Sequence, residues 1–196
     1  PAVPGGTLVF TGTVTNTGNA TLTNVFVVNN QPAANTPVLG PITLLPGAGV
    51  TFTGNYLVPL NSCSVAETLT ATGRIAGTGM AVTNTASANC PVATLPLLII
   101  TQNCPPNPVS PGGLLIYSGA VSNAGNITLN NVVVTNSQSG NTPILVLPVL
   151  VPGAAMNFTG SYLAPATGPS TSASTARAMS LCGVSVTNSA SSTCVI

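Results

Sequence analysis

The stretch Asn16–Val25 reads NTGNATLTNV, and it returns almost unchanged at Asn123–Val132 as NAGNITLNNV. In both, the segment Asn-Xaa-Gly-Asn is typical of a turn, because Asn and Gly accept the positive φ that tight turns require. The β-branched and apolar residues that follow are typical of a strand. The stretch therefore predicts a strand–turn–strand corner that the chain contains twice. A binding loop is the alternative for the same residues.

The duplication extends well beyond this corner. Three further motifs occur twice and keep their order: PGG from Pro4 and from Pro111, PGAGVTFTGNYL from Pro46 against PGAAMNFTGSYL from Pro152, and VTNTASANC from Val82 against VTNSASSTC from Val186. The spacing between copies changes only across turn-like segments, where insertions and deletions are tolerated. The chain is a tandem duplication, and we predict two domains, 1–92 and 93–196.

Each copy shows the two-residue period of β-strands. In Leu8–Val14, the residues Leu8, Phe10, Gly12 and Val14 share one face, and Val9 and two threonines share the other. Gly- and Pro-containing turns separate such runs, and no segment keeps a helical period for three turns. Roughly seven short strands in about 90 residues favour an immunoglobulin-like sandwich. The predicted fold is all-β, with two tandem immunoglobulin-like β-sandwiches.

The composition excludes several classes of function. Charged residues make up 2% of the 196 residues, and the chain has no histidine, whereas about 25% of residues are charged in an average globular domain. Glu67 is the sole acidic residue, so neither a carboxylate pair nor a histidine-activated nucleophile can form. We expect no catalytic residues, no metal site and no cofactor. We expect Glu67 and Arg74 to be solvent-exposed strand residues.

Low charge also limits the partners. Two arginines and no lysine cannot neutralise a phosphate backbone, so we expect no nucleic-acid binding. No apolar run approaches the roughly 20 residues of a membrane helix, so we expect no membrane insertion. Near-zero net charge instead favours association. The expected partners are copies of the chain itself or neighbouring repeats of a longer chain.

The segments TVTNTGNATLTNVFVVN, LLPGAGVTFTGNY and VTNTASA, in this order, resemble the bacterial "conserved repeat domain" family of tandem immunoglobulin-like repeats in large cell-surface and secreted proteins. The resemblance covers nearly all of both copies. The family often has an acidic residue where this chain has Asn29 or Asn136, so a calcium role suspected for such repeats finds no carboxylate here. The resemblance implies a structural module of an extracellular assembly.

Five cysteines in a chain without a CxxC motif suggest an oxidising compartment. The strand order of an immunoglobulin-like sandwich places Cys63 and Cys90 at one end of the first sandwich. It places Cys104 and Cys194 together in the second, with Cys182 in the last hairpin at the opposite end. We therefore expect disulfides Cys63–Cys90 and Cys104–Cys194. Cys182 is then either a buried free thiol or the site of an intermolecular bridge.

Three sequons, at Asn19, Asn126 and Asn157, are candidates for N-glycosylation. Outward Thr and Ser residues are candidates for O-glycosylation. Glycans would make a nearly uncharged surface soluble, and an uncoated surface is the alternative. Aromatic residues make up only 4% of the chain and Trp is absent, which leaves few platforms for binding sugars.

The segment LPLLIITQ precedes the second copy, and the first copy shows nothing similar ahead of Pro4. Copy one is thus expected to lack its own first strand, which leaves a vacancy at a sheet edge that no lysine protects. The apolar residues of the segment are Leu95, Leu97, Leu98, Ile99 and Ile100. We expect them to form either the first strand of copy two or a strand donated across a junction.

These features together predict the structural subunit of an extracellular filament, fibril or cell-surface stalk. Assembly is expected to be head-to-tail, through β-strand or end contacts, because such contacts do not close into rings. The alternative function is an adhesin-type binding module, whose corner loops recognise glycans or a host surface.

Overall fold

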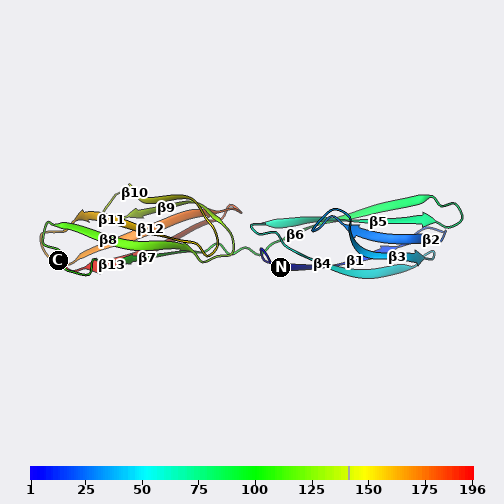
Figure 1. Ribbon diagram of the computed structural model, residues 1–196, viewed down its shortest axis with the longest axis horizontal. Helices are drawn as coiled ribbons and strands as arrows, with labels where there is room; N and C mark the ends of the chain where they lie inside the picture. Colours follow the sequence, from blue (N-terminus) through cyan, green and yellow to red (C-terminus); the bar gives the residue numbers. More distant parts are fainter. Residues whose placement is uncertain (141) are drawn as a thin grey trace. The chain divides into compact units, whose positions relative to one another are not determined.

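The structure is a computed structural model that describes residues 1–140 and 142–196. These residues form two compact units, unit 1 (Pro1–Ala93) and unit 2 (Thr94–Ile196), divided one residue after the predicted boundary. Both units are immunoglobulin-like β-sandwiches without a helix in the described residues, as predicted (Figure 1). No helix that could cross a membrane occurs in residues 1–140 and 142–196.

Unit 1 pairs a two-stranded sheet with a four-stranded sheet. Strands β1 (Thr7–Thr15) and β4 (Gly49–Leu57) form the first, and the order of the second is β3-β2-β5-β6. The bounds of its strands are β2 (Leu22–Asn29), β3 (Thr36–Leu44), β5 (Ser64–Ile75) and β6 (Ala81–Pro91). The inward faces of β1 and β4 supply Leu8, Phe10, Phe52 and Tyr56 to the core, in the predicted alternation.

Unit 2 repeats this arrangement and adds one strand. Its four-stranded sheet has the order β10-β9-β12-β13, and its other sheet has three strands in the order β11-β8-β7. The bounds are β7 (Leu98–Asn103), β8 (Leu114–Asn123), β9 (Leu129–Asn136), β10 (Pro143–Leu150), β11 (Ala155–Leu163), β12 (Ser170–Ser180) and β13 (Ser185–Cys194). Strands β8–β13 are the counterparts of β1–β6, and β7 is the additional strand.

The corners at Asn16–Val25 and Asn123–Val132 have the same construction. The Asn16 Nδ2 donates to the carbonyl oxygens of Ala20 and Leu44 at 2.8 and 3.0 Å. Its counterpart Asn123 makes the equivalent pair of bonds at 2.9 Å each. Both side chains are almost fully buried, and their hydrogen bonds hold each turn against a neighbouring strand. The repeated stretch is therefore a structural corner, as predicted, and Asn is required because one side chain must both donate and accept.

Cross-strand pairs of threonine and serine hydroxyls lie on the outer faces of the sheets. Thr68 faces Ser87 at 2.9 Å between hydroxyl oxygens, and Thr171 faces Thr193 at 2.8 Å. Such cross-strand pairs contribute a few tenths of a kcal/mol to about 1 kcal/mol each. They explain how these strands present a polar outer face although the chain has almost no charged residues.

Candidate functional site

Strand β7 closes unit 2 between β8 and β13 (Figure 1). It runs antiparallel to β8 and pairs with Ser118–Asn123. Leu98 and Ile100 are 2% and 6% exposed and belong to the core of the unit. On the other side, the Nδ2 of Asn188 in β13 donates to the carbonyl oxygen of Leu98 at 2.8 Å. One sheet and the facing strand thus both hold β7.

The same position is open in unit 1. Gly12 pairs with Phe52 as Gly119 pairs with Phe158, so the counterpart of the β7-binding segment Ser118–Asn123 is Thr11–Asn16, the end of β1 and the residue after it. Within residues 1–93, all of which the structure describes, β1 pairs with β4 alone. A groove of about 610 Å³ lies here, lined by Thr11–Asn16 on one side and Val82–Ala88 of β6 on the other.

The exposure of individual residues shows what the missing strand would cover. Every residue of Ala81–Asn89 in β6 is exposed, whereas in β13 the inward residues alternate as half-buried positions. Val121 and Leu129 are fully buried in unit 2. Their unit 1 counterparts, Val14 and Leu22, are only half-buried. The groove is therefore an incomplete core that lacks a strand of the β7 type.

In unit 2 the corner at Asn123–Asn126 also forms hydrogen bonds to Leu95–Leu97, the lead-in segment that precedes β7. The backbone N–H of Ala124 donates to the carbonyl oxygen of Leu97 at 2.9 Å, and that of Asn126 donates to Leu95 at 3.0 Å. In return, the Oδ1 of Asn126 accepts from the N–H of Leu95 at 2.6 Å. A Cβ on Gly125 would lie 2.1 Å from the carbonyl oxygen of Leu95. Glycine is needed there because another backbone passes so close.

Unit 1 keeps the same corner residues without the segment that uses them. Gly18 is the counterpart of Gly125, yet a Cβ at Gly18 would meet nothing nearer than the Oδ1 of Asn16, at 3.3 Å. Asn19 is the counterpart of Asn126, and it is exposed. The corner of unit 1 therefore has the shape that receives a lead-in segment, and no segment within residues 1–93 occupies it.

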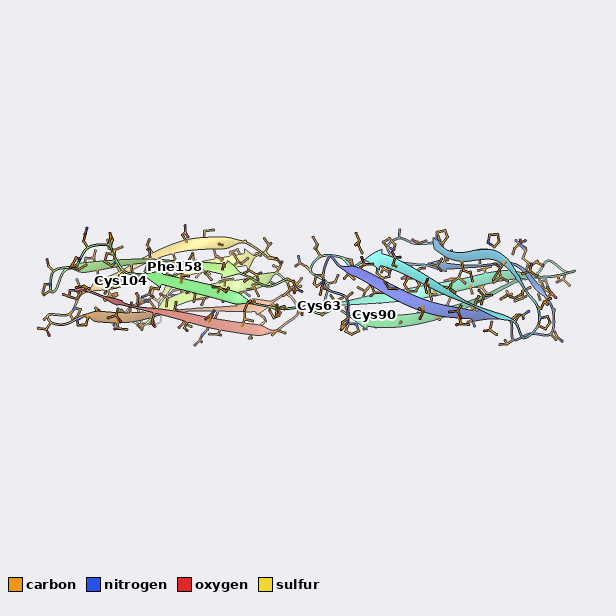
Figure 2. The ribbon with its side chains drawn as sticks, turned by 90° about the horizontal axis from the view of Figure 1, so that it is seen from below. Cys63, Cys90, Cys104 and Phe158 are labelled. Carbon is orange, nitrogen blue, oxygen red and sulfur yellow. A yellow bond between two sulfur atoms is a disulfide. The ribbon has the colours of Figure 1, made fainter. Side chains whose placement is uncertain are left out.

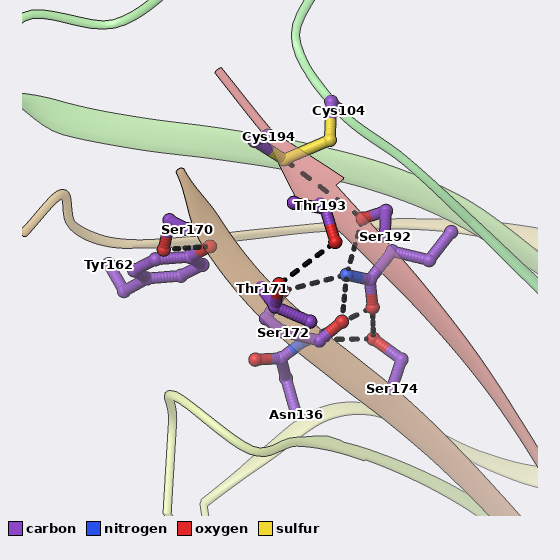
Figure 3. Close-up of a disulfide and its surroundings, with 11 residues drawn as sticks. Cys104, Asn136, Tyr162, Ser170, Thr171, Ser172, Ser174, Ser192, Thr193 and Cys194 are labelled. Atoms are coloured by element: carbon purple, nitrogen blue, oxygen red, sulfur yellow. Dashed lines mark hydrogen bonds between the residues drawn. A yellow bond between two sulfur atoms is a disulfide. The ribbon is translucent and has the colours of Figure 1, made fainter. Parts of the chain in front are cut away.

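A polar pocket holds the third inward residue of β7, Gln102. Its Nε2 donates to the Oγ atoms of Ser172 and Ser192 at 2.7 and 2.9 Å. Its Oε1 accepts from the Nδ2 of Asn136 at 3.1 Å and from the Oγ of Ser174. Figure 3 shows these partners converging from β9, β12 and β13. Every polar atom of the buried amide is thus satisfied.

In unit 1 a carboxylate lines the equivalent pocket. Strand register makes Glu67 the counterpart of Ser172, and Leu69 and Ala88 the counterparts of Ser174 and Ser192. Glu67 is 5% exposed, and Asn29 donates to its Oε2 at 3.3 Å. The expectation that Glu67 is solvent-exposed was wrong. Its side chain points inward because the place of the glutamine amide is open and Asn29 offers a donor.

The two equivalent tyrosines differ because of one substitution. The hydroxyl of Tyr162 lies 3.1 Å from the Oγ of Ser170. In unit 1 the counterpart of Ser170 is Val65, and the buried hydroxyl of Tyr56 has no hydrogen-bond partner among the described residues. Burial, and secondarily the negative charge of Glu67, raises the pKa of Tyr56 to about 12.

The cysteines follow the same asymmetry. Cys104, directly after β7, forms a disulfide with Cys194, with a Cα–Cα distance of 5.3 Å (Figure 3), and this pairing confirms the prediction. Cys90, the counterpart of Cys194, is a free cysteine within the described part of the chain (Figure 2). Cys63 and Cys182 are both disulfide-bonded.

Two predictions about cysteines were therefore wrong, namely the Cys63–Cys90 pair and a free Cys182. Cys63 does lie at the end of unit 1 that contains Cys90, since its carbonyl oxygen accepts a hydrogen bond from the backbone N–H of Val92. In this fold the residue at the Cys90 position bonds to a cysteine after the first strand, which unit 1 does not contain. Within residues 1–93, copy one has neither this strand nor the cysteine that follows it. The absence of both can be read from the sequence.

The remaining predicted residues are placed as follows. The segment from Leu95 to Ile100 belongs to unit 2 as its own first strand and lead-in, so the structure selects the first of the two alternatives. Of the sequon residues, Asn19 and Asn157 are exposed and Asn126 is half-buried. Sequence patterns alone did not identify Gln102 or Asn188, because their role depends on contacts across the sandwich.

Comparisons with known proteins leave the family open. No family model matches the sequence, and no curated protein matches it. The similar solved structures include red sea bream transglutaminase, fibronectin(III)-like modules of CbhA from Clostridium thermocellum and the CupB2 chaperone of Pseudomonas aeruginosa. Their sequence identities are 15%, 10% and 9%, with TM-scores of 0.37, 0.28 and 0.33.

The alignments cover 99%, 99% and 96% of this chain, and 29%, 88% and 93% of the respective structures. The chain therefore spans less than a third of the transglutaminase. Since all three TM-scores lie below 0.5, none of these similarities bears on function.

Proposed function

We propose that the chain is a non-enzymatic structural subunit of an extracellular filament, fibril or surface stalk. In this assembly a β-strand from a neighbouring subunit fills the open position beside β1 of unit 1. The observation that carries the proposal is the internal comparison: the same position is filled by β7 in unit 2. An extended segment that adds to an exposed sheet edge gains main-chain hydrogen bonds and side-chain pockets together.

The energetics are adequate for a joint between subunits. A strand like β7 would bury two large apolar side chains, each worth about 1.5–3 kcal/mol. It would also satisfy the backbone groups of Thr11–Asn16 that face the groove. Ordering a free strand costs about 1–2 kcal/mol for each residue fixed. Docking of a free strand is therefore expected to be measurable but weak, and a tether or a further bond between the subunits would strengthen it.

The surface supports the same function. Disulfides are compatible with an oxidising, extracellular location. The chain has no lysine, so its edge strands lack the charge with which sheet edges are usually protected from pairing. We propose that glycans on exposed positions away from the groove, Asn157 among them, keep the other faces soluble. The open edge of β1 is then left as the surface available for pairing.

Electron microscopy of the native, unreduced protein tests this function, together with the intact mass of dissociated subunits. We expect filaments with a repeat near two sandwich lengths, and density for an added strand beside β1. Mass beyond that of the polypeptide, lost on enzymatic deglycosylation, would identify glycans. Short, monodisperse particles with the groove of unit 1 empty would contradict the proposal, and the adhesin alternative would then take its place.

A further inference from the structure

We propose that the strand received by unit 1 carries a cysteine that forms an intermolecular disulfide with Cys90, and that this bond locks the joint between subunits. The inference rests on the proposed strand addition and adds the chemistry of the partner. The partner is an extended segment with the inward pattern of β7: two apolar residues, one hydrogen-bond donor and one cysteine, at alternate positions.

The position of the cysteine follows from strand register. Cys90 pairs across its sheet with Val65, and Cys194 pairs with Ser170, which is the counterpart of Val65. In unit 2 the bond to Cys194 comes from Cys104, two residues after Gln102 and thus on the same face of the extended chain. A strand that enters unit 1 in the β7 register therefore brings its residue at this position against Cys90.

The other side chains of the groove are arranged to receive this strand. Asn188 accepts the N–H of Ser189 through Oδ1, at 2.7 Å, and donates through Nδ2 to β7. Its counterpart Asn84 accepts the N–H of Thr85 in the same way, at 2.8 Å. Asn84 also lines the groove. It is thus oriented as Asn188 is, with its donor available for the first carbonyl of the strand.

The third inward position faces Glu67 in place of a serine. A carboxylate only accepts hydrogen bonds, so the incoming side chain there must donate. An amide such as that of Gln102 meets this condition, and an acidic side chain does not. The groove thus selects its strand at four successive inward positions. The first two require apolar side chains, the third requires a hydrogen-bond donor for Glu67, and the fourth requires a thiol for Cys90.

The bond forms by oxidation of two thiols. Cys90 and the incoming cysteine each lose a proton and an electron, and the two electrons reduce an external disulfide oxidant to two thiols. Oxidised glutathione is the oxidant in the test below. Cys90 is half-buried, so the incoming strand both delivers the second thiol and covers the product.

Synthetic peptides with the sequence of residues 95–104 provide the test on the full chain. LPLLIITQNC is compared with LPLLIITQCN, which has the same composition but places the thiol on the opposite face of the strand. LPLLIITQNS measures docking without the bond, through protection of Thr11–Asn16 from hydrogen exchange. Digestion and mass spectrometry without reduction identify the cysteine that has reacted, and a Cys90→Ser chain is the control.

We expect LPLLIITQNS to protect Thr11–Asn16, and LPLLIITQNC to bond to Cys90 at least tenfold faster than LPLLIITQCN. Equal rates for the two cysteine peptides, or mixed disulfides of Cys90 with glutathione alone, would overturn the lock and leave strand addition standing. Failure of all three peptides to protect the groove would instead overturn the strand addition itself.

Discussion

Cys90 and Cys194 stand at the same position of two equivalent sheets, yet Cys194 is disulfide-bonded and Cys90 is free within the described chain. The difference arises because unit 2 contains β7 and the cysteine that follows it. Unit 2 thus shows what a completed unit looks like, and each difference from unit 1 yields a matched pair of variants.

The two corner glycines should respond differently to the same change. In Gly125→Ala, the new Cβ would lie 2.1 Å from the carbonyl oxygen of Leu95, so we expect a loss of about 1–3 kcal/mol in the stability of unit 2. In Gly18→Ala the Cβ meets no backbone, so we expect a change below about 0.5 kcal/mol in unit 1.

Chemical denaturation with hydrogen exchange in each unit measures both effects. The same Gly18→Ala chain should bind LPLLIITQNS at least tenfold more weakly, because the lead-in would then clash at the corner. Unchanged peptide affinity would show that the corner of unit 1 does not receive a lead-in segment.

The two tyrosines should also differ at neutral pH. Tyr56→Phe removes a buried hydroxyl without a partner among the described residues, so we expect unit 1 to become more stable by up to about 1–3 kcal/mol. Tyr162→Phe removes the partner of Ser170 and should cost unit 2 about 1 kcal/mol. The free energy of unfolding of each unit is the measurement. Destabilisation of unit 1 by Tyr56→Phe would reveal a partner for its hydroxyl.

Alkaline pH should act on unit 1 through Tyr56. Its folded pKa is about 12, against 10.0 for the ordinary side chain. The unfolded chain releases this proton above pH 10, whereas the folded chain keeps it until about pH 12. The stabilisation is therefore complete below pH 10 and declines between pH 10 and 12, by at most about 1.4 kcal/mol per pH unit.

Denaturation of unit 1 at pH 9, 10, 11 and 12 measures this slope. The Tyr56→Phe chain is its reference, since it lacks the titrating group and should lose less stability over the same interval. Identical slopes in the two chains would contradict a raised pKa for Tyr56.

Glu67 should discriminate between incoming strands. A peptide with Glu at the Gln102 position, LPLLIITENS, would place a second carboxylate against Glu67 in a buried pocket. We expect it to bind at least tenfold more weakly than LPLLIITQNS at pH 7, measured by titration calorimetry. In the Glu67→Ser chain this penalty should shrink markedly. A penalty of the same size in both chains would show that Glu67 does not face the incoming strand.

The sequence was sufficient to predict the fold, because the period of two in Leu8–Val14 and the doubled corner specify strands and their connections. It also predicted the Cys104–Cys194 bond from strand order. It misplaced Glu67, because a strand position facing an open pocket has the same local pattern as one facing solvent. It misassigned Cys90, because the pairing of that residue is decided by a strand distant in sequence.

The antiparallel pairing of β7 with β8 has a consequence for any assembly built on the groove of unit 1. A strand that enters beside β1 has only one allowed direction, since reversal would misplace its cysteine and its lead-in. Every junction in such an assembly then has the same sense, and its two ends are chemically unlike, because only one of them exposes an unfilled groove. Such a filament can elongate at one tip while the other stays anchored to a surface.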